Sequence, residues 1–224
     1  MAGVRRRPAS PAVLAPRPLE VVRAFGGGAR QGVLVIHSWW GLTDSFRAYG
    51  EALAKEGFVV GLADLFDGRT ASDIAEAKAL RAMRRSEPMY RTLMRDLAGL
   101  RKEAGTERVG LVGFSMGGHW AVWLSQRPEL PVAAAVLYYA ARAGDFGGSR
   151  ASYLAHFAVE DGWVSAAARK RMEKEIAKAG RPYRAHVYPG AGHWFAENDR
   201  PEYEPAAAAL AFARTVGHLR ACRA

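Results

Sequence analysis

Short apolar runs alternate with longer segments of helical periodicity along most of the 224-residue chain, and this alternation constrains the fold more than any other feature. The apolar runs are rich in β-branched residues and are bounded by glycine or polar residues, which is typical of strands buried on both faces. We expect such strands at residues 33–36, 58–63, 109–113, 132–139, 152–157 and 184–188. Helices are expected at residues 43–56, 116–126, 165–179 and 201–219, and two more lie within residues 71–104, divided at Pro88. The pattern predicts an α/β fold with a doubly wound, mostly parallel sheet and helices on both faces.

The chain is expected to form one domain that follows an N-terminal arm. Its first 20 residues contain four arginines and four prolines, a composition that disfavours both helix and central strand. The remaining length is sufficient for a single hydrophobic core. We therefore predict a flexible arm at residues 1–20 and one domain at residues 21–224, present as a monomer or a homodimer.

The sequence has no segment that we expect to enter a membrane or the secretory pathway. No stretch approaches the ~18 uninterrupted apolar residues of a membrane span, and residues 1–18 lack the apolar core of a secretory signal. The single cysteine, Cys222, cannot form an internal disulfide. We expect a cytoplasmic protein.

The formal net charge of +10 raises the question of nucleic acid as a partner. The basic residues are scattered over expected helix faces with acidic residues among them, and no nucleic-acid-binding motif accompanies them. The charge is therefore interpreted as a solvated surface, and neither nucleic acid nor a membrane is expected as a partner.

A candidate nucleophile lies between an expected strand and an expected helix, in the sequence Gly-Phe-Ser-Met-Gly-Gly at residues 113–118. This G-x-S-x-G pattern in a strand–turn–helix context predicts a nucleophile elbow with Ser115 at its apex. Only small residues at Gly113 and Gly117 allow such a tight turn to close. Because Met116 would begin the helix, its backbone N–H is expected to stabilise a developing oxyanion.

Two further strand ends supply a base and an acid for this serine. Asp161 follows the expected strand at residues 152–157, and His193 follows the expected strand at residues 184–188. The carboxyl ends of parallel strands share one edge of the sheet, and the order Ser, Asp, His is the one that α/β hydrolases use. A serine hydroxyl needs a base and a group that orients the base, so Ser115, His193 and Asp161 are the candidate triad. Glu160 is a weaker rival for the acid.

The loop at residues 37–42 occupies the position where this fold takes its second oxyanion donor, which we assign to the backbone N–H of Trp39. Large aromatic residues adjoin the expected catalytic loops and are candidates to line a substrate pocket: Trp39, Trp40, Trp163 and Trp194. No spacing of metal ligands and no phosphate-binding or dinucleotide-binding fingerprint is present, so no metal or other cofactor is expected.

Taken together, the motifs at residues 37–42, 63–66, 113–118, 161–164 and 191–195 resemble those of the dienelactone hydrolase family over roughly residues 20–220. The resemblance implies an α/β-hydrolase fold and cleavage of an ester or lactone. Founding members of the family use a cysteine nucleophile, so Ser115 would make this chain a serine-type variant.

Three further residues are placed in the substrate pocket by the resemblance. Ser38 stands where the family commonly has a glutamate that helps control the nucleophile. Glu197 stands where founding members have an arginine that binds the substrate carboxylate, and Arg69 is aligned with a second such arginine. Because a carboxylate in place of an arginine would repel an anion, a neutral or differently shaped ester or lactone is the expected substrate.

The sequence therefore predicts a hydrolase of small-molecule esters or lactones that acts through an acyl-enzyme on Ser115. Two alternatives remain open. The same triad could serve acyl transfer or peptide cleavage, since pocket shape decides the acceptor and the leaving group. The chain could also be a non-catalytic binding protein that keeps the hydrolase fold.

Overall fold

The computed structural model describes residues 17–23, 31–83 and 86–222. The strands in these residues are β1 (Glu20–Arg23), β2 (Gly32–Ile36), β3 (Val59–Ala63), β4 (Val109–Phe114), β5 (Val132–Tyr138), β6 (Ser152–Glu160) and β7 (Tyr183–Gly192). The helices are α1 (Asp44–Lys55), α2 (Ile74–Met83), α3 (Ser86–Ala104), α4 (Met116–Ser125), α5 (Ala166–Lys178) and α6 (Pro205–Ala221). Residues 1–16 of the predicted arm lie outside the described residues, so the arm stays a prediction.

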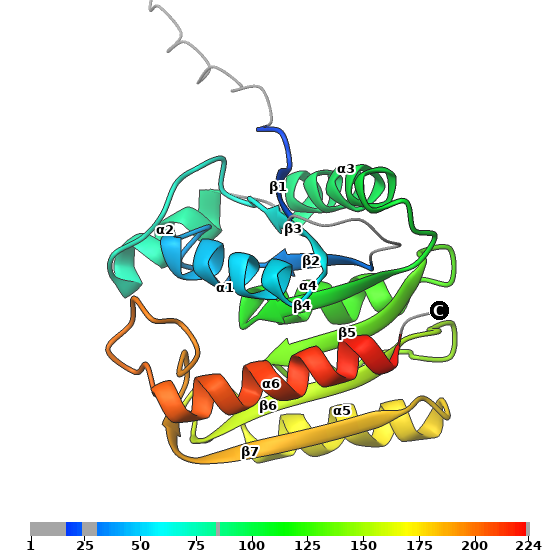
Figure 1. Cartoon of the computed structure of the whole chain (residues 1–224). Coiled ribbons are helices and arrows are strands. Elements are labelled where there is room, and N and C mark those ends of the chain that lie inside the picture. The colour runs from blue at the N-terminus through cyan, green and yellow to red at the C-terminus, as the bar shows by residue number, and fades with distance from the viewer. Residues whose placement is uncertain (1–16, 24–30, 84–85, 223–224) are drawn as a thin grey trace, which may run out of the picture.

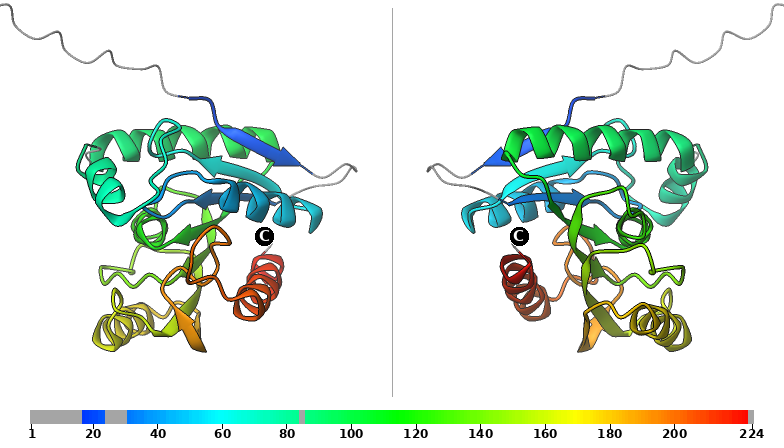
Figure 2. Two further views of the ribbon diagram at one scale, coloured as in Figure 1. Left: turned by 90° about the vertical axis from the view of Figure 1, so that its left-hand side faces the viewer. Right: turned by 90° about the vertical axis from the view of Figure 1, so that its right-hand side faces the viewer.

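The seven strands form one sheet with the order β1-β3-β2-β4-β5-β6-β7. Only the edge strand β1 is antiparallel to its neighbour, and β2 to β7 all run parallel. Helices α1 and α6 lie on one face, and α4 and α5 lie on the other (Figure 2). The predicted doubly wound α/β fold is confirmed. In the part of the chain described above, no helix has the length and apolar character needed to cross a membrane.

The continuous apolar runs became the central strands because both of their faces are covered. Every residue of β2, β3, β4 and β5 is buried. Such burial is typical of a parallel sheet with helices on both sides, and it explains why these strands lack alternating polar residues. The core of the protein therefore lies along these central strands, and Figure 1 shows their place in the sheet.

Some element boundaries differ from those predicted. The edge strand β1 was not predicted, because its four residues are only partly buried and carry charges at both ends. Pro88 lies inside the first turn of α3 and not between two helices. Backbone N–H groups in a first turn have no acceptor within the helix, so a proline there breaks no helical hydrogen bond. Helix α6 begins at Pro205 and not at Pro201, because residues 201–202 form a turn and residues 203–204 have no regular structure.

The register of the sheet brings the functional strand ends together. Ile36 at the end of β2 pairs with Gly113 in β4, and Phe114 at the end of β4 pairs with Tyr138 at the end of β5. At the far side of the sheet, Glu160 in β6 pairs with Gly192 in β7. The segments that follow these strands therefore meet at the same edge of the sheet, where ligands bind in folds of this class.

Candidate active site

Ser115 lies at a sharp turn between β4 and α4. Its backbone has φ 49° and ψ −109°, a conformation that a residue with a side chain rarely adopts. The Ser115 N–H donates a hydrogen bond to the Tyr138 carbonyl at 2.9 Å, which fixes the turn on the neighbouring strand. A Cβ atom at Gly117 would lie 2.1 Å from the Ile36 carbonyl oxygen, and one at Gly113 would lie 2.3 Å from the Gly117 carbonyl oxygen. Only glycine fits at both positions, as the elbow pattern requires.

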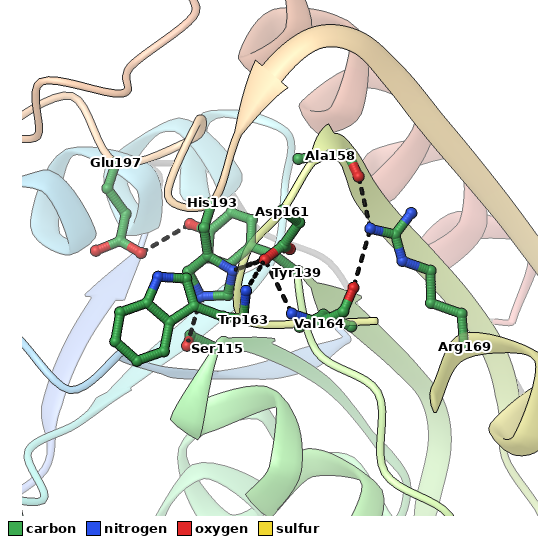
Figure 3. A network of polar contacts seen from close by, with 9 residues as sticks. All are labelled: Ser115, Tyr139, Ala158, Asp161, Trp163, Val164, Arg169, His193 and Glu197. Carbon is green, nitrogen blue, oxygen red and sulfur yellow. Dashed lines mark hydrogen bonds and ion pairs between the residues drawn. The ribbon is translucent and has the colours of Figure 1, made fainter. Parts of the chain in front are cut away.

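His193 and Asp161 reach this serine from the ends of β7 and β6. Ser115 Oγ lies 2.9 Å from His193 Nε2, and His193 Nδ1 lies 2.9 and 3.0 Å from the two carboxylate oxygens of Asp161. Since an ionised carboxylate only accepts, we assign the imidazole proton to Nδ1, which leaves Nε2 to accept from the serine hydroxyl. The structure thus brings the three predicted residues into one hydrogen-bonded chain (Figure 3).

The environment of Asp161 favours its charged form. Burial raises the pKa of this carboxyl, but the hydrogen bond from His193 and those from the backbone N–H groups of Trp163 and Val164 outweigh it. The pKa of Asp161 is therefore lowered from its ordinary value. A carboxylate that stays ionised can hold the imidazole in one tautomer and stabilise its protonated form.

Arg169 of α5 supports the loop that carries Asp161. Its guanidinium group donates to the Ala158 carbonyl at 2.7 Å and to the Val164 carbonyl at 3.2 Å, and so ties the end of β6 to the loop (Figure 3). From the sequence alone, Arg169 is one of the basic residues scattered over expected helix faces, which were interpreted as a solvated surface. Its role could not be found from sequence, because backbone carbonyl acceptors leave no pattern in side-chain types.

A pocket of about 760 Å³ opens beside Ser115, Met116 and His193. Three of the predicted pocket residues, Trp39, Trp163 and Trp194, line it. Further lining side chains come from α3 and α4 and were not predicted as site residues: Tyr90, His119, Trp120 and Trp123. In a sequence, aromatic residues at helical spacing are ordinarily interpreted as core residues. Only the structure shows that these side chains lie beside the elbow and line the pocket. The pocket is predominantly aromatic near Ser115, with charged side chains such as Arg81, Arg127, Glu129 and Arg142 elsewhere in its wall.

The other predicted pocket residues lie outside this lining. Trp40 is buried and packs edge-on against Trp39 and Trp194. Arg69 is exposed, and its guanidinium group contacts the sulfur of Met83 at 3.9 Å. Ser38 and Glu197 are buried beneath the site and bind each other, with Ser38 Oγ donating to Glu197 Oε2 at 2.8 Å. The structure therefore does not place the Glu197 carboxyl where it would repel an anionic substrate, which removes the reason for expecting a neutral one.

The two predicted oxyanion donors adjoin the serine. Met116 is the first residue of α4, so its N–H has no acceptor within the helix. Trp39 lies in the turn that follows β2, and both residues line the same pocket as Ser115. Their role as donors stays a prediction. Within the described ranges, no cluster of three or more His, Cys, Asp or Glu side chains is placed to hold a metal ion.

Glu197 is buried in a way that should make stability depend on pH. Burial raises the pKa of its carboxyl from 4.5 to about 8, although hydrogen bonds from Tyr139 and Ser38 oppose the shift. Between these two pH values the folded chain keeps a proton that the unfolded chain has released, so rising pH favours unfolding. This contribution to stability is complete below pH 4.5 and is lost as pH rises through about 8.

Glu197→Gln is expected to remove this pH dependence, because glutamine stays neutral. The loss of unfolding free energy attributable to Glu197 is at most about 1.4 kcal/mol per pH unit across the window. Urea unfolding at about pH 5 and about pH 8 measures it. The wild type is expected to lose more stability than the variant between these conditions, by an amount on the order of a few kcal/mol. Equal losses in the two proteins would contradict a protonated, buried Glu197.

The parallel sheet and the Ser–His–Asp arrangement at its carboxyl edge define the chain as an α/β hydrolase. The sequence model of the dienelactone hydrolase family matches residues 22–222, and the chain belongs to this family. The predicted resemblance is thus confirmed, and the protein is a hydrolase of the ester and lactone class.

Individual relatives are distant. A protein of Azospirillum brasilense named "Putative carboxymethylenebutenolidase" is 30% identical over 216 residues, which cover 89% of this chain and 91% of the relative. A Bradyrhizobium protein named "Probable 2-oxo-3-(5-oxofuran-2-ylidene)propanoate lactonase" is 26% identical over 209 residues, covering 86% and 84%. Among solved structures, a "Putative Dienelactone Hydrolase" from Klebsiella pneumoniae matches with a TM-score of 0.78 at 19% identity, covering 89% and 91%. At that identity the structural likeness supports the fold alone.

Proposed function

We propose that the protein hydrolyses a carboxylic ester or lactone through an acyl-enzyme on Ser115. Ser115 Oγ attacks the carbonyl carbon while His193 Nε2 takes the hydroxyl proton, and the imidazolium then gives this proton to the departing alkoxide. A water molecule repeats the sequence on the acyl-enzyme, and the acid product leaves with Ser115 restored. The observation that carries this proposal is the unbroken hydrogen-bonded chain from Ser115 through His193 to Asp161.

Oxyanion stabilisation is assigned to the backbone N–H groups of Met116 and Trp39. The negative charge that develops on the carbonyl oxygen needs fixed donors, and such donors provide a large share of the rate enhancement in acyl transfer. The position of Met116 at the N-terminus of α4 supports its assignment, because the helix dipole favours negative charge there.

The substrate that fits the pocket has an apolar ring or acyl part. The rings of Trp163 and Trp194 contact that of His193, and Trp39 packs against both tryptophans. All three line the pocket and offer aromatic faces and edges to a bound group. Apolar pockets with a few convergent polar groups are typical of small-molecule sites. A small ester or lactone is therefore the proposed substrate. A panel of neutral and anionic esters, thioesters and amides would determine which net charge and which leaving group the pocket accepts.

Labelling with a fluorophosphonate tests the proposal. The reagent should lose fluoride and form one phosphorus–oxygen bond to Ser115 Oγ, because the adjacent imidazole activates only this hydroxyl. Mass spectrometry of digested protein should locate the label on Ser115 and leave Ser125 unlabelled. Ser125 is a buried serine at the last position of α4, and its hydroxyl binds the Val122 carbonyl and the Tyr153 hydroxyl. Short-chain p-nitrophenyl esters should be hydrolysed, and prior labelling should abolish the hydrolysis. A folded protein that takes no label would favour a non-catalytic binding protein.

A further inference from the structure

Glu197 joins two loops of the site through one buried carboxyl group. Its Oε2 accepts a hydrogen bond from Ser38 Oγ at 2.8 Å, and its Oε1 accepts one from the Tyr139 hydroxyl at 2.8 Å (Figure 3 shows the second). Ser38 lies two residues beyond β2, Tyr139 directly follows β5, and Glu197 lies in the turns after β7. All three are almost completely buried. The carboxyl group therefore connects the ends of three strands.

Tyr139 carries this connection to the candidate base. Its ring packs against the imidazole of His193 with ring centroids 4.9 Å apart, and it also contacts Phe195. Its backbone has a φ of 39°, which is unusual for a residue with a large side chain and must be maintained by its surroundings. The bond from its hydroxyl to Glu197 is a contact that can hold the ring against His193.

Ser38 carries the connection to the candidate oxyanion loop. Besides donating to Glu197, the Ser38 Oγ accepts a hydrogen bond from the Trp40 N–H at 3.4 Å. This hydrogen bond bridges Trp39, which lies between Ser38 and Trp40. Trp39 is the proposed second oxyanion donor. A shift of Ser38 would therefore move the backbone that presents this N–H to the substrate.

Burying a carboxyl group at such a position carries a desolvation free energy that opposes folding. Burial raises its pKa to about 8, and an apolar side chain of similar size would be less costly to bury. An apolar side chain, however, could not bind two hydroxyl groups that arrive from different strands. The chemistry of the group thus suits the fixing of geometry better than simple packing.

We propose that Glu197 is a positioning residue of the active site, whose carboxyl oxygens fix Tyr139 and Ser38 and thereby place the His193 ring and the Trp39 amide relative to Ser115. This inference rests on the proposed function. It assigns Glu197 no contact with the substrate, in agreement with its absence from the pocket lining.

Two variants of the same contact test the proposal. Tyr139→Phe removes only the hydroxyl and keeps the ring beside His193, and Glu197→Leu removes both acceptors at similar volume. Each is expected to lower kcat for p-nitrophenyl esters by about 10- to 100-fold, because small misplacements of reacting groups have effects of this order. KM is expected to change little, since neither residue lines the pocket. Glu197→Gln is expected to have a higher kcat than Glu197→Leu, because its amide oxygen still accepts a hydrogen bond from one hydroxyl.

Tyr153→Phe is the matched control. Tyr153 is also a fully buried tyrosine, and its hydroxyl bonds Ser125 Oγ at 2.9 Å and Ser149 Oγ at 2.7 Å. It lies near the start of β6, away from the carboxyl ends of the strands. Its loss should reduce stability as the loss of another buried hydroxyl does, but kcat should stay at the wild-type value. A kcat loss in Tyr153→Phe equal to that in Tyr139→Phe would show a merely structural effect and overturn the proposal.

The double variant Tyr139→Phe/Glu197→Leu separates a shared contact from two independent ones. If both residues act through the same hydrogen bond, the double variant should lose little more kcat than the more impaired single variant. Losses that multiply, or single variants with wild-type kcat, would overturn the role of Glu197 while Ser115 is still labelled by the fluorophosphonate. A wild-type protein that takes no label would instead overturn the proposed function, and this inference with it.

Discussion

Ser115→Ala is expected to lower kcat for p-nitrophenyl esters by about 10⁶-fold, the loss that removal of the nucleophile causes in other serine hydrolases. Alanine cannot form the acyl-enzyme, and the His193 imidazole, still held by Asp161, then has no hydroxyl to activate. The fold should persist, because the Ser115 hydroxyl makes one hydrogen bond and alanine is no more strained than serine at this positive φ. Thermal unfolding should therefore resemble that of the wild type.

The measurement is initial ester hydrolysis together with fluorophosphonate labelling of the same samples. Ser125→Ala is the control, since it removes a buried serine hydroxyl at the far end of α4 that does not contact His193. It should keep both labelling and turnover. Hydrolysis by Ser115→Ala within about tenfold of the wild type would exclude Ser115 as the nucleophile, and residual activity far below that is expected from substrate binding and the oxyanion donors alone.

The central part of the fold could be predicted because its signals are local. The apolar runs at β2, β4 and β5 are buried on both faces, and continuous hydrophobicity is a direct consequence of that environment. The edge strand β1 was missed because an edge position requires little burial, so a sequence such as Glu-Val-Val-Arg carries no distinctive pattern. The late start of α6 was missed for a related reason, since the turns before it contain residues that a helix also accepts.

The candidate triad could be predicted because strand topology determines which loops lie side by side. Once Ser115, Asp161 and His193 were each placed after a parallel strand, the shared edge of the sheet brought them together. The supporting residues could not be found in this way. Tyr139 and Arg169 act through a hydroxyl and through backbone carbonyls, and these contacts depend on side-chain directions that no sequence pattern fixes.

Glu197 shows how a resemblance to a family can assign a residue to the pocket and still misjudge the direction of its side chain. Its position four residues after His193 suggested a side chain in the pocket. The turn from Trp194 to Glu197, closed by a 2.9 Å backbone hydrogen bond, instead accompanies a carboxyl directed to Ser38 and Tyr139. The conclusion about substrate charge depended on that direction and changes with it.

Asp161→Asn is expected to lower kcat by about 10⁴-fold, the loss seen when the orienting carboxylate of a Ser–His–Asp triad becomes an amide. The asparagine oxygen can still accept the Trp163 and Val164 N–H groups that bind Asp161 Oδ1, so the loop should remain in place. Its NH₂ group would then face His193 Nδ1 and donate to it. This favours the tautomer with the proton on Nε2, which cannot accept the proton of Ser115.

Glu160→Gln distinguishes this effect from a general loss of negative charge. Glu160 is the adjacent carboxylate and the rival acid of the sequence analysis, but it is exposed at the end of β6. Its replacement should leave kcat within about twofold, as expected for a surface change away from the reacting atoms. A large loss in Glu160→Gln with normal turnover in Asp161→Asn would reverse the assignment. The ratio of kcat for Asp161→Asn to kcat for Glu160→Gln therefore reports the effect of the Asp161–His193 contacts, at 2.9 and 3.0 Å, on the tautomer of His193.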